Sequence, residues 1–182
     1  MSTAAQEFAG TYEIDRTHSS VQFAVRHMQV SLFRASFEGV DGRLVADDSG
    51  LRLEGRVPVE SVSIPSEPSE FRDHVVRGGD FFDADAHPEI SFRSTSLELD
   101  GGRARVAGEL TIRGLTRAVT ALGTYESPIE DPYGSRRASL ELRATVDRRS
   151  WNMDWQAALP SGGDALGWEV EVSANLELVE AA

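Results

Sequence analysis

The chain has 182 residues, of which 40% are hydrophobic, so it is long and apolar enough to fold as one domain or two small ones. Acidic residues outnumber basic residues by 30 to 18, and the formal net charge is −12. Nucleic acids and anionic membrane surfaces attract the opposite charge, so neither is an expected partner. The absence of cysteine excludes disulfides, thiol nucleophiles and thiolate metal sites.

The first ten residues, MSTAAQEFAG, contain neither a basic segment nor an apolar run. A secretory signal peptide is therefore not expected, and the predicted location is cytoplasmic. Stable membrane insertion is not expected either, because no stretch approaches the ~18 apolar residues of a spanning helix. We predict a flexible terminus over residues 1–9 and a single domain over residues 10–182.

Strand patterns begin where Tyr12 and Ile14 alternate with acidic residues. After a polar turn at residues 17–20, the alternation continues over residues 21–25. The apolar phase slips by one residue around 28–32, which predicts a bulge or a bend of the kind that curved barrels use. Two turns with clustered Gly, Asp and Ser are predicted at residues 39–42 and 47–50.

A further strand at residues 51–59 contains Pro58, which is tolerated at a sheet edge or a bulge. The pattern breaks at residues 66–85, where residues 70–76 fit two helical turns that end near two glycines. Strand patterns return at residues 90–99, 104–112, 116–125 and 140–146. The total is eight or nine strands and one short helix, and the hairpin-length connections indicate an antiparallel sheet.

The last strand pattern, at residues 168–178, is the plainest in the chain. Apolar residues from Trp168 to Leu178 alternate with polar and acidic ones, so one face is apolar and the other is wet. Such a face must be covered by other strands or must enclose something. A sandwich and a closed barrel both satisfy this, and strands of about ten residues favour the barrel. Filling of the barrel by its own side chains and a cavity for an apolar guest both stay open on periodicity alone.

Five motifs follow one another in the chain. They are Tyr12-x-Ile14-Asp15-x-x-His18-Ser19-x-Val21-x-Phe23-x-Val25-x-His27, Phe71-Arg72-Asp73-His74, Asp80-Phe81-Phe82-Asp83 with His87-Pro88-x-Ile90-x-Phe92, Gly108-x-Leu110-Thr111-Ile112-Arg113-Gly114, and Asp147-Arg148. In this order the motifs resemble the YceI-like family of polyisoprenoid-binding proteins over roughly residues 10–180. The chain departs from the family pattern at Tyr12, where Trp is usual, and at residues 150–152.

The resemblance implies an all-β fold, namely a lipocalin-like, eight-stranded antiparallel β-barrel whose interior holds a long isoprenoid chain. It implies binding, transport or storage of a lipid such as a polyprenyl pyrophosphate or an isoprenoid quinone, without catalysis and without a cofactor. A homodimer is compatible with the family. An enzyme that uses the barrel as a substrate tunnel is the alternative, and a packed β-domain that serves only protein contacts is a third.

Alternation and loop position select the residues expected to contact the lipid chain. On the inward face we place Phe23, Val25, Phe37, Leu53, Phe92, Leu110, Ile112, Leu140, Leu142, Val170 and Val172. Three aromatic residues on loops or loop edges are expected to line a mouth, namely Phe81, Phe82 and Trp151. Core packing without any ligand contact is the alternative for all of them.

Five cationic or titratable side chains are candidates for the polar head of the lipid, because guanidinium groups match phosphate geometry. They are His27, Arg72, His74, Arg113 and Arg148. Ordinary pairing with the many surface carboxylates is the simpler alternative. No metal site is expected, since His18 lies nine residues from His27 and so faces the other way, toward backbone or carboxylate partners. No catalytic motif is found, and no catalytic residue is predicted.

Overall fold

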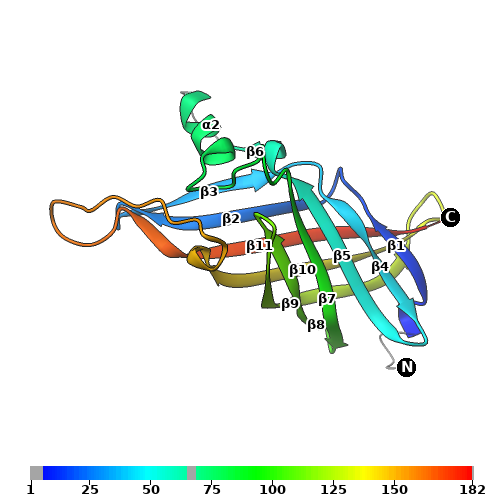
Figure 1. The fold of residues 1–182 in the computed structure, drawn as a ribbon. Helices are drawn as coiled ribbons and strands as arrows, with labels where there is room; N and C mark the ends of the chain where they lie inside the picture. The colour runs from blue at the N-terminus through cyan, green and yellow to red at the C-terminus, as the bar shows by residue number, and fades with distance from the viewer. Residues whose placement is uncertain (1–5, 65–68, 182) are drawn as a thin grey trace.

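Strands with one apolar face close on themselves in this protein and form an antiparallel barrel (Figure 1). The computed structural model describes residues 6–64 and 69–181. The strands are β1 (Gly10–Ile14), β2 (Ser20–His27), β3 (Ser31–Phe37), β4 (Asp41–Asp47), β5 (Gly50–Pro58), β6 (Val62–Ser63), β7 (Glu89–Asp100), β8 (Arg103–Ile112), β9 (Leu115–Glu130), β10 (Arg136–Asp147) and β11 (Leu166–Glu180). The helical elements are α2 (Ser69–Arg77) and the short 3₁₀ turns η1 (Val59–Ser61) and η2 (Arg148–Trp151).

The ring runs β1-β4-β5-β7-β8-β9-β10-β11, and β1 pairs with β11 to close it. The prediction of an eight-stranded antiparallel barrel with a short helix is confirmed. The remaining strands continue strands of the ring. The carboxyl-terminal part of β11 pairs with β1, for example Leu178 with Ile14, while its earlier part pairs with β2, for example Asn175 with Ser20. β1 and β2 therefore act as one strand with a bend at residues 15–19, and β4 and β3 bend beside it at residues 38–40.

Three local expectations were wrong. The phase slip at residues 28–32 is the β2–β3 hairpin turn and not a bulge, because Met28 and Gln29 both adopt positive φ and let the chain reverse without glycine. β4 was not predicted, because the two turns expected on either side of it leave only a short segment. The alternation of β11 is interrupted before Val170, because the pairing of β11 with β2 shifts register between Leu166 and Val170.

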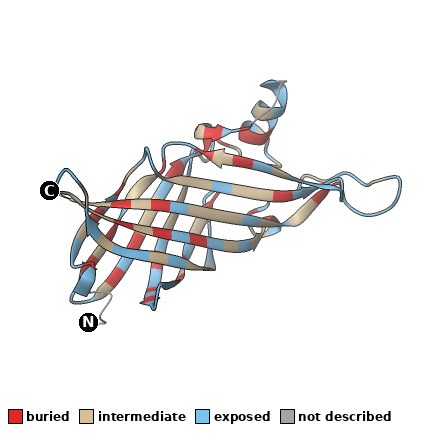
Figure 2. Cartoon of the chain, turned by 180° about the vertical axis from the view of Figure 1, so that it is seen from behind, coloured by how far each residue is buried: buried red, intermediate tan, exposed pale blue. Residues whose placement is uncertain are grey.

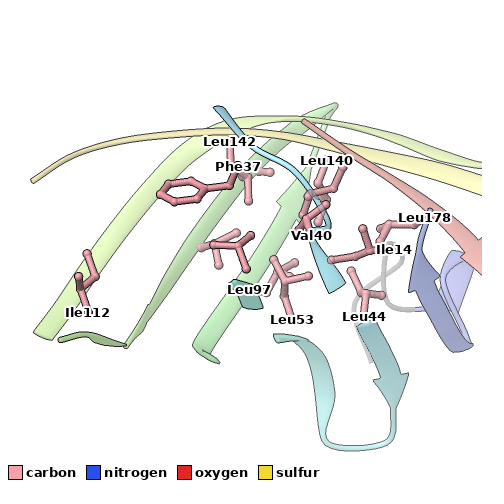
Figure 3. Close-up of a cluster of buried hydrophobic side chains, with 14 of the residues drawn as sticks. Ile14, Phe37, Val40, Leu44, Leu53, Leu97, Ile112, Leu140, Leu142 and Leu178 are labelled. Carbon is pink, nitrogen blue, oxygen red and sulfur yellow. The ribbon is translucent and has the colours of Figure 1, made fainter. Parts of the chain in front are cut away.

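The segment before β1 and the end of β11 lie at one end of the barrel, which we call the packed end (Figures 1 and 2). Its interior holds Tyr12, Leu44, Leu140 and Leu178, all 0% exposed. Cross-strand neighbours such as Ile14 and Leu178 meet there, and Figure 3 shows them within the buried cluster. Of the segment expected to be flexible, residues 1–5 lie outside the described residues, whereas Phe8 is fully buried.

Phe8 packs its ring against two tyrosines at this end. The ring centroids are 5.7 Å from Tyr12 and 6.1 Å from Tyr125. Apolar burial of an aromatic ring explains why the segment before β1 is held on the barrel.

The opposite end carries the β2–β3 turn, the loop of residues 152–165 and α2, and we call it the cavity end (Figures 1 and 2). β3 pairs with β6 only at Ser36 and Phe37, which leaves residues 31–35 without a ladder on that side. α2 and the loop of residues 78–88 cover this gap. Phe33 meets Phe71 of α2 at 5.8 Å, and Phe82 of the loop meets both Phe23 and Phe37.

Candidate functional site

A cavity of about 900 Å³ lies inside the barrel at the cavity end. Its lining comes from β2, β3, α2, the loop of residues 78–88, and the ends of β7, β8, β10 and β11 that meet there, together with Val57 of β5, Arg148 of η2 and the loop of residues 152–165. The volume is at the upper end of the range of about 300–1,000 Å³ that is typical of small-molecule sites. An interior of this size separates a ligand-binding barrel from one filled by its own side chains.

The strand register explains why the cavity wall is apolar. Val146 of β10 faces Val170 of β11, Val170 faces Val25 of β2, and Val25 faces Phe33 of β3. Because every second residue of a strand points inward, this row forms one band of apolar side chains across four strands. A parallel row one step away contains Val172 and Phe23.

A smaller cavity of about 150 Å³ continues the space toward the packed end. The two cavities share six lining residues, which are Val21, Val57, Ile90, Leu110, Val146 and Val172. The smaller cavity also reaches Leu53, Phe92 and Leu142. Beyond it the fully buried side chains of the packed end fill the barrel. The interior therefore narrows away from the cavity end.

The mouth is marked by exposed lining residues, and we define it by His27, Leu32, Phe71 and His74; Gln22 and Arg34 of β2 and β3 are the other exposed residues of the lining. His74 Nε2 lies 3.0 Å from Asp80 Oδ1, and its ring stands edge-on to Phe81 at 5.1 Å. Phe81 in turn stacks on Trp155 with the ring centroids 5.8 Å apart. The mouth combines aromatic side chains with two imidazoles, which suits a ligand with an apolar body and a polar end.

Arg148 is the one charged side chain of the described residues that is fully buried, with 3% exposed. Its guanidinium donates to the carbonyl oxygens of Gly167 (2.8 Å), Met153 (2.6 Å) and Leu166 (3.3 Å), and it lies 4.2 Å from the centre of the Trp168 ring. Burial lowers the pKa of Arg148, partly offset by nearby acidic residues. The side chain borders the cavity and fastens η2 to the start of β11.

The structure distributes the residues predicted for the lipid chain over three environments. The large cavity is lined by Phe23, Val25, Phe37, Phe81, Phe82, Leu110, Ile112, Val170 and Val172, and the small one by Leu53, Phe92 and Leu142 together with Leu110 and Val172. Leu140 and Trp151 border neither cavity. Leu140 belongs to the packed end, and Trp151 is 2% exposed and donates its indole N–H to the Leu110 carbonyl oxygen at 3.3 Å.

The residues predicted for the polar head do not come together. His27, His74 and Arg148 line the cavity, while Arg72 and Arg113 lie outside its lining. Arg72 donates to the carbonyl oxygens of Glu60 (2.5 Å) and Val62 (3.3 Å). Arg113 donates to the carbonyl oxygens of Gly79 (2.7 Å) and Asn152. Both arginines hold loops at the cavity end in place.

Thirteen lining residues were not predicted from the sequence. They are Val21, Gln22, Leu32, Phe33, Arg34, Val57, Phe71, Val75, Ile90, Val146, Met153, Trp155 and Leu166. Val21, Phe33 and Val146 carry the same alternation as the predicted set, so a stricter use of that pattern would have included them. Met153 and Trp155 lie in an irregular loop, where no periodic signal exists.

Asp15, His18 and Glu177 form a cluster whose ligand-type atoms lie within 4.8 Å of one another. Arg137 donates to the carboxylates of Asp15 (2.9 Å), Glu177 (2.5 Å) and Asp131 (2.7 Å). The guanidinium group therefore supplies the positive charge that balances these carboxylates. His18 Nδ1 lies 2.9 Å from Asp15 Oδ2, which confirms the expected carboxylate partner. The Asp15 carboxylate raises the pKa of His18, and hydrogen bonds from His18 and Arg137 lower the pKa of Asp15. This is an ion-pair network at the bend between β1 and β2.

Comparison with known proteins gives a consistent result. A family model described as the YceI-like domain matches residues 12–178. Protein YceI of Shigella flexneri is 28% identical over 156 residues, which cover 84% of this chain and 81% of that protein. A UPF0312 protein of Pseudomonas aeruginosa is 29% identical over 154 residues, which cover 83% of this chain and 80% of that protein.

Solved structures show the same fold. BcnA of Burkholderia cenocepacia superposes with a TM-score of 0.71 at 20% identity, covering 90% of this chain and 98% of that one. A polyisoprenoid-binding domain from Saccharophagus degradans superposes with a TM-score of 0.67 at 12% identity, covering 93% and 98%. Within residues 6–64 and 69–181, no helix has the length and apolar character needed to cross a bilayer.

Proposed function

Because the chain belongs to the YceI-like family, we propose that it binds the chain of a long isoprenoid-type lipid in the cavity, for transport or storage and without catalysis. One observation carries the proposal, namely the cavity of about 900 Å³ with its almost wholly apolar lining. The polyisoprenoid-binding domain of Saccharophagus degradans has the same fold and supports the choice of lipid class.

The narrowing of the interior toward the packed end orients the ligand. Transfer of one five-carbon isoprene unit from water into the cavity is favourable by a free energy of about 4 kcal/mol, at about 0.8 kcal/mol per carbon. The cost of ordering the chain reduces this gain. The apolar tail therefore enters first and runs toward Leu110 and Val172, which border both cavities. The polar end stays at the mouth, where His27 and His74 can donate hydrogen bonds to a hydroxyl, carbonyl or phosphate.

The direct test is organic extraction of the purified protein followed by mass spectrometry, combined with uptake of a C20 polyprenol that is followed by intrinsic fluorescence. Trp155 lines the cavity and is the expected reporter. We expect Val172→Trp to fill the channel and abolish uptake, whereas Glu171→Trp, on the opposite face of the same strand, leaves uptake unchanged. Recovery of no long-chain lipid, with no uptake by the wild-type protein, would refute the proposal.

Incubation with lipid, compared between the wild-type protein and His27→Ala, distinguishes catalysis from binding, because His27 lies at the mouth. A binding protein returns the bound lipid chemically unchanged, and His27→Ala alters only affinity. Conversion of the lipid during incubation, lost in His27→Ala while lipid affinity is kept, would instead establish an enzyme that uses the barrel as its substrate tunnel.

A further inference from the structure

The β2–β3 turn presents apolar side chains to solvent at the cavity end. Met28 and Leu32 are each 39% exposed, and Val30 is 80% exposed. Large apolar residues exposed singly are common, but three within one hairpin turn form a contiguous apolar tip. A soluble partner or an apolar phase that covers this tip would gain binding free energy.

The tip is held in a defined shape. Met28 and Gln29 have φ values of 50° and 60°, in the left-handed region that non-glycine residues seldom adopt. The loop of residues 152–165 braces them, since the Met28 amide donates to Ala165 O (2.6 Å) and the Gln29 side chain donates to Gly162 O (3.3 Å). The exposed position of Val30 is thus part of the folded structure and not a frayed turn.

The tip is continuous with the mouth of the cavity. Leu32 lines the cavity and is also part of the tip, and Phe71 on α2 lines it while remaining 41% exposed. Phe71 meets Phe33, the residue next to Leu32, at 5.8 Å between ring centroids. An apolar path therefore leads from Val30 across Leu32 into the barrel.

The charge of this turn is opposite to that of the whole chain. Residues 26–34 contain Arg26 and Arg34 and no acidic residue, although the chain has a net charge of −12. Across the part of the chain that the structure describes, neither arginine takes part in an ion pair. At physiological salt the Debye length is about 8 Å, so charges on the far side of the barrel are largely screened from a surface that meets the tip.

We propose that the turn of residues 26–34, together with Phe71, docks on the surface of a lipid bilayer and brings the mouth against it. This inference rests on the proposed function, because it concerns how the lipid enters. A long apolar chain that crossed water would expose every isoprene unit, whereas a mouth pressed on the bilayer lets the chain slide along an apolar path. Arg26 and Arg34 flank the apolar tip and complement anionic headgroups, which makes a bilayer the fitting occupant.

Flotation with phosphatidylcholine vesicles, with and without phosphatidylglycerol, tests the docking. We expect the wild-type protein to float with the vesicles, more so when phosphatidylglycerol is present, and Val30→Asp to reduce the bound fraction about tenfold. Ile129→Asp is the matched control, because Ile129 is 70% exposed on β9 at the packed end. Arg26→Glu with Arg34→Glu should remove the preference for phosphatidylglycerol, while Arg105→Glu, exposed on β8, should keep it.

Polyprenol uptake from dilute ethanol and its transfer from donor vesicles separate this inference from the proposed function. We expect Val30→Asp to take up the polyprenol from ethanol like wild type but to extract it from vesicles more slowly. Wild-type uptake from ethanol without flotation would overturn the docking and leave the proposed function intact. Absence of uptake from either source would overturn the proposed function. The docking would also be overturned if the wild-type protein formed a dimer and did not bind vesicles, and if Val30→Asp made this dimer dissociate. The tip would then be an interface with a second copy of the chain.

Discussion

The two ends of the barrel share strands and alternation, yet one is solid and the other is hollow. On β10 the inward residues change from Leu140 and Leu142 near the packed end to Ala144 and Val146 near the cavity end. On β11 the inward residues are Leu178 and Leu176 toward the packed end and Ala174, Val172 and Val170 toward the cavity end. The inward leucines of both strands therefore lie toward the packed end, where the short Ala138 faces Leu178. The smaller inward side chains therefore leave space for a ligand toward the cavity end.

The ends also differ in what closes them. At the packed end Phe8 comes from outside the ring of strands and is fully buried among its side chains. At the cavity end α2 and the loop of residues 78–88 cover a gap beside β3 and leave a mouth. The buried contacts of Phe8 stabilise the packed end, whereas the cover at the cavity end, in which Phe71 stays exposed, leaves a route for a ligand.

The largest contrast is expected from removing one inward side chain at each end. Leu140→Ala should lower the free energy of unfolding by about 3 kcal/mol, because it opens a void in a filled core. Val172→Ala should lower it by about 1 kcal/mol or less, because it only enlarges an existing cavity. Urea unfolding of both variants measures the difference. Equal losses would mean that the cavity end is packed as tightly as the other, and the contrast between the ends would fail.

An intermediate effect on the free energy of unfolding is expected from buried polar groups, because they are hydrogen-bonded at one end and not at the other. At the cavity end three carbonyl oxygens satisfy Arg148, whereas at the packed end the Tyr12 hydroxyl has no hydrogen-bond partner among the described residues. Burial also raises the pKa of Tyr12, so the hydroxyl stays protonated. Tyr12→Phe should therefore raise the free energy of unfolding by about 1 kcal/mol, measured by urea unfolding. Tyr133→Phe, at a residue 92% exposed, should change nothing, and a loss of stability in Tyr12→Phe would reveal a partner for the hydroxyl.

The sequence predicts the wall of the barrel better than its interior. A period of two is a local property, so the faces of the strands could be derived from it, whereas the antiparallel sheet was derived from the short connections and the eight-stranded barrel from the resemblance to a family. The reversal at Met28 and Gln29 could not, because two non-glycine residues take up a conformation that composition does not signal. β4 was missed for a related reason, since the turns expected at both of its ends leave a pattern too short to recognise.

Depth along the barrel axis is invisible to periodicity. Leu140 and Val172 both point inward, but only the register between β10 and β11 shows that they lie at different levels. The same limit applies to Trp151 and Trp155, which are four residues apart, one buried in the core and the other on the cavity. Resemblance to a family supplies the expectation of a cavity, but the lining residues depend on register and on loops, which are set by tertiary contacts.

The smallest effect is expected at the bend that joins the two ends, where His18 contacts Asp15. The pKa of His18 is raised above 6.5 by this carboxylate, so its stabilising contribution is complete below about 6.5 and is lost as the pH rises through the raised pKa. The urea midpoint of the wild-type protein should fall as the pH rises above about 6.5, and His18→Gln should flatten this decline. The change is small because the His18 side chain is 57% exposed. His87→Gln is the control, because His87 forms no ion pair within residues 6–64 and 69–181. An equal flattening in His87→Gln would show that the contact between His18 and Asp15 does not cause the pH dependence of stability.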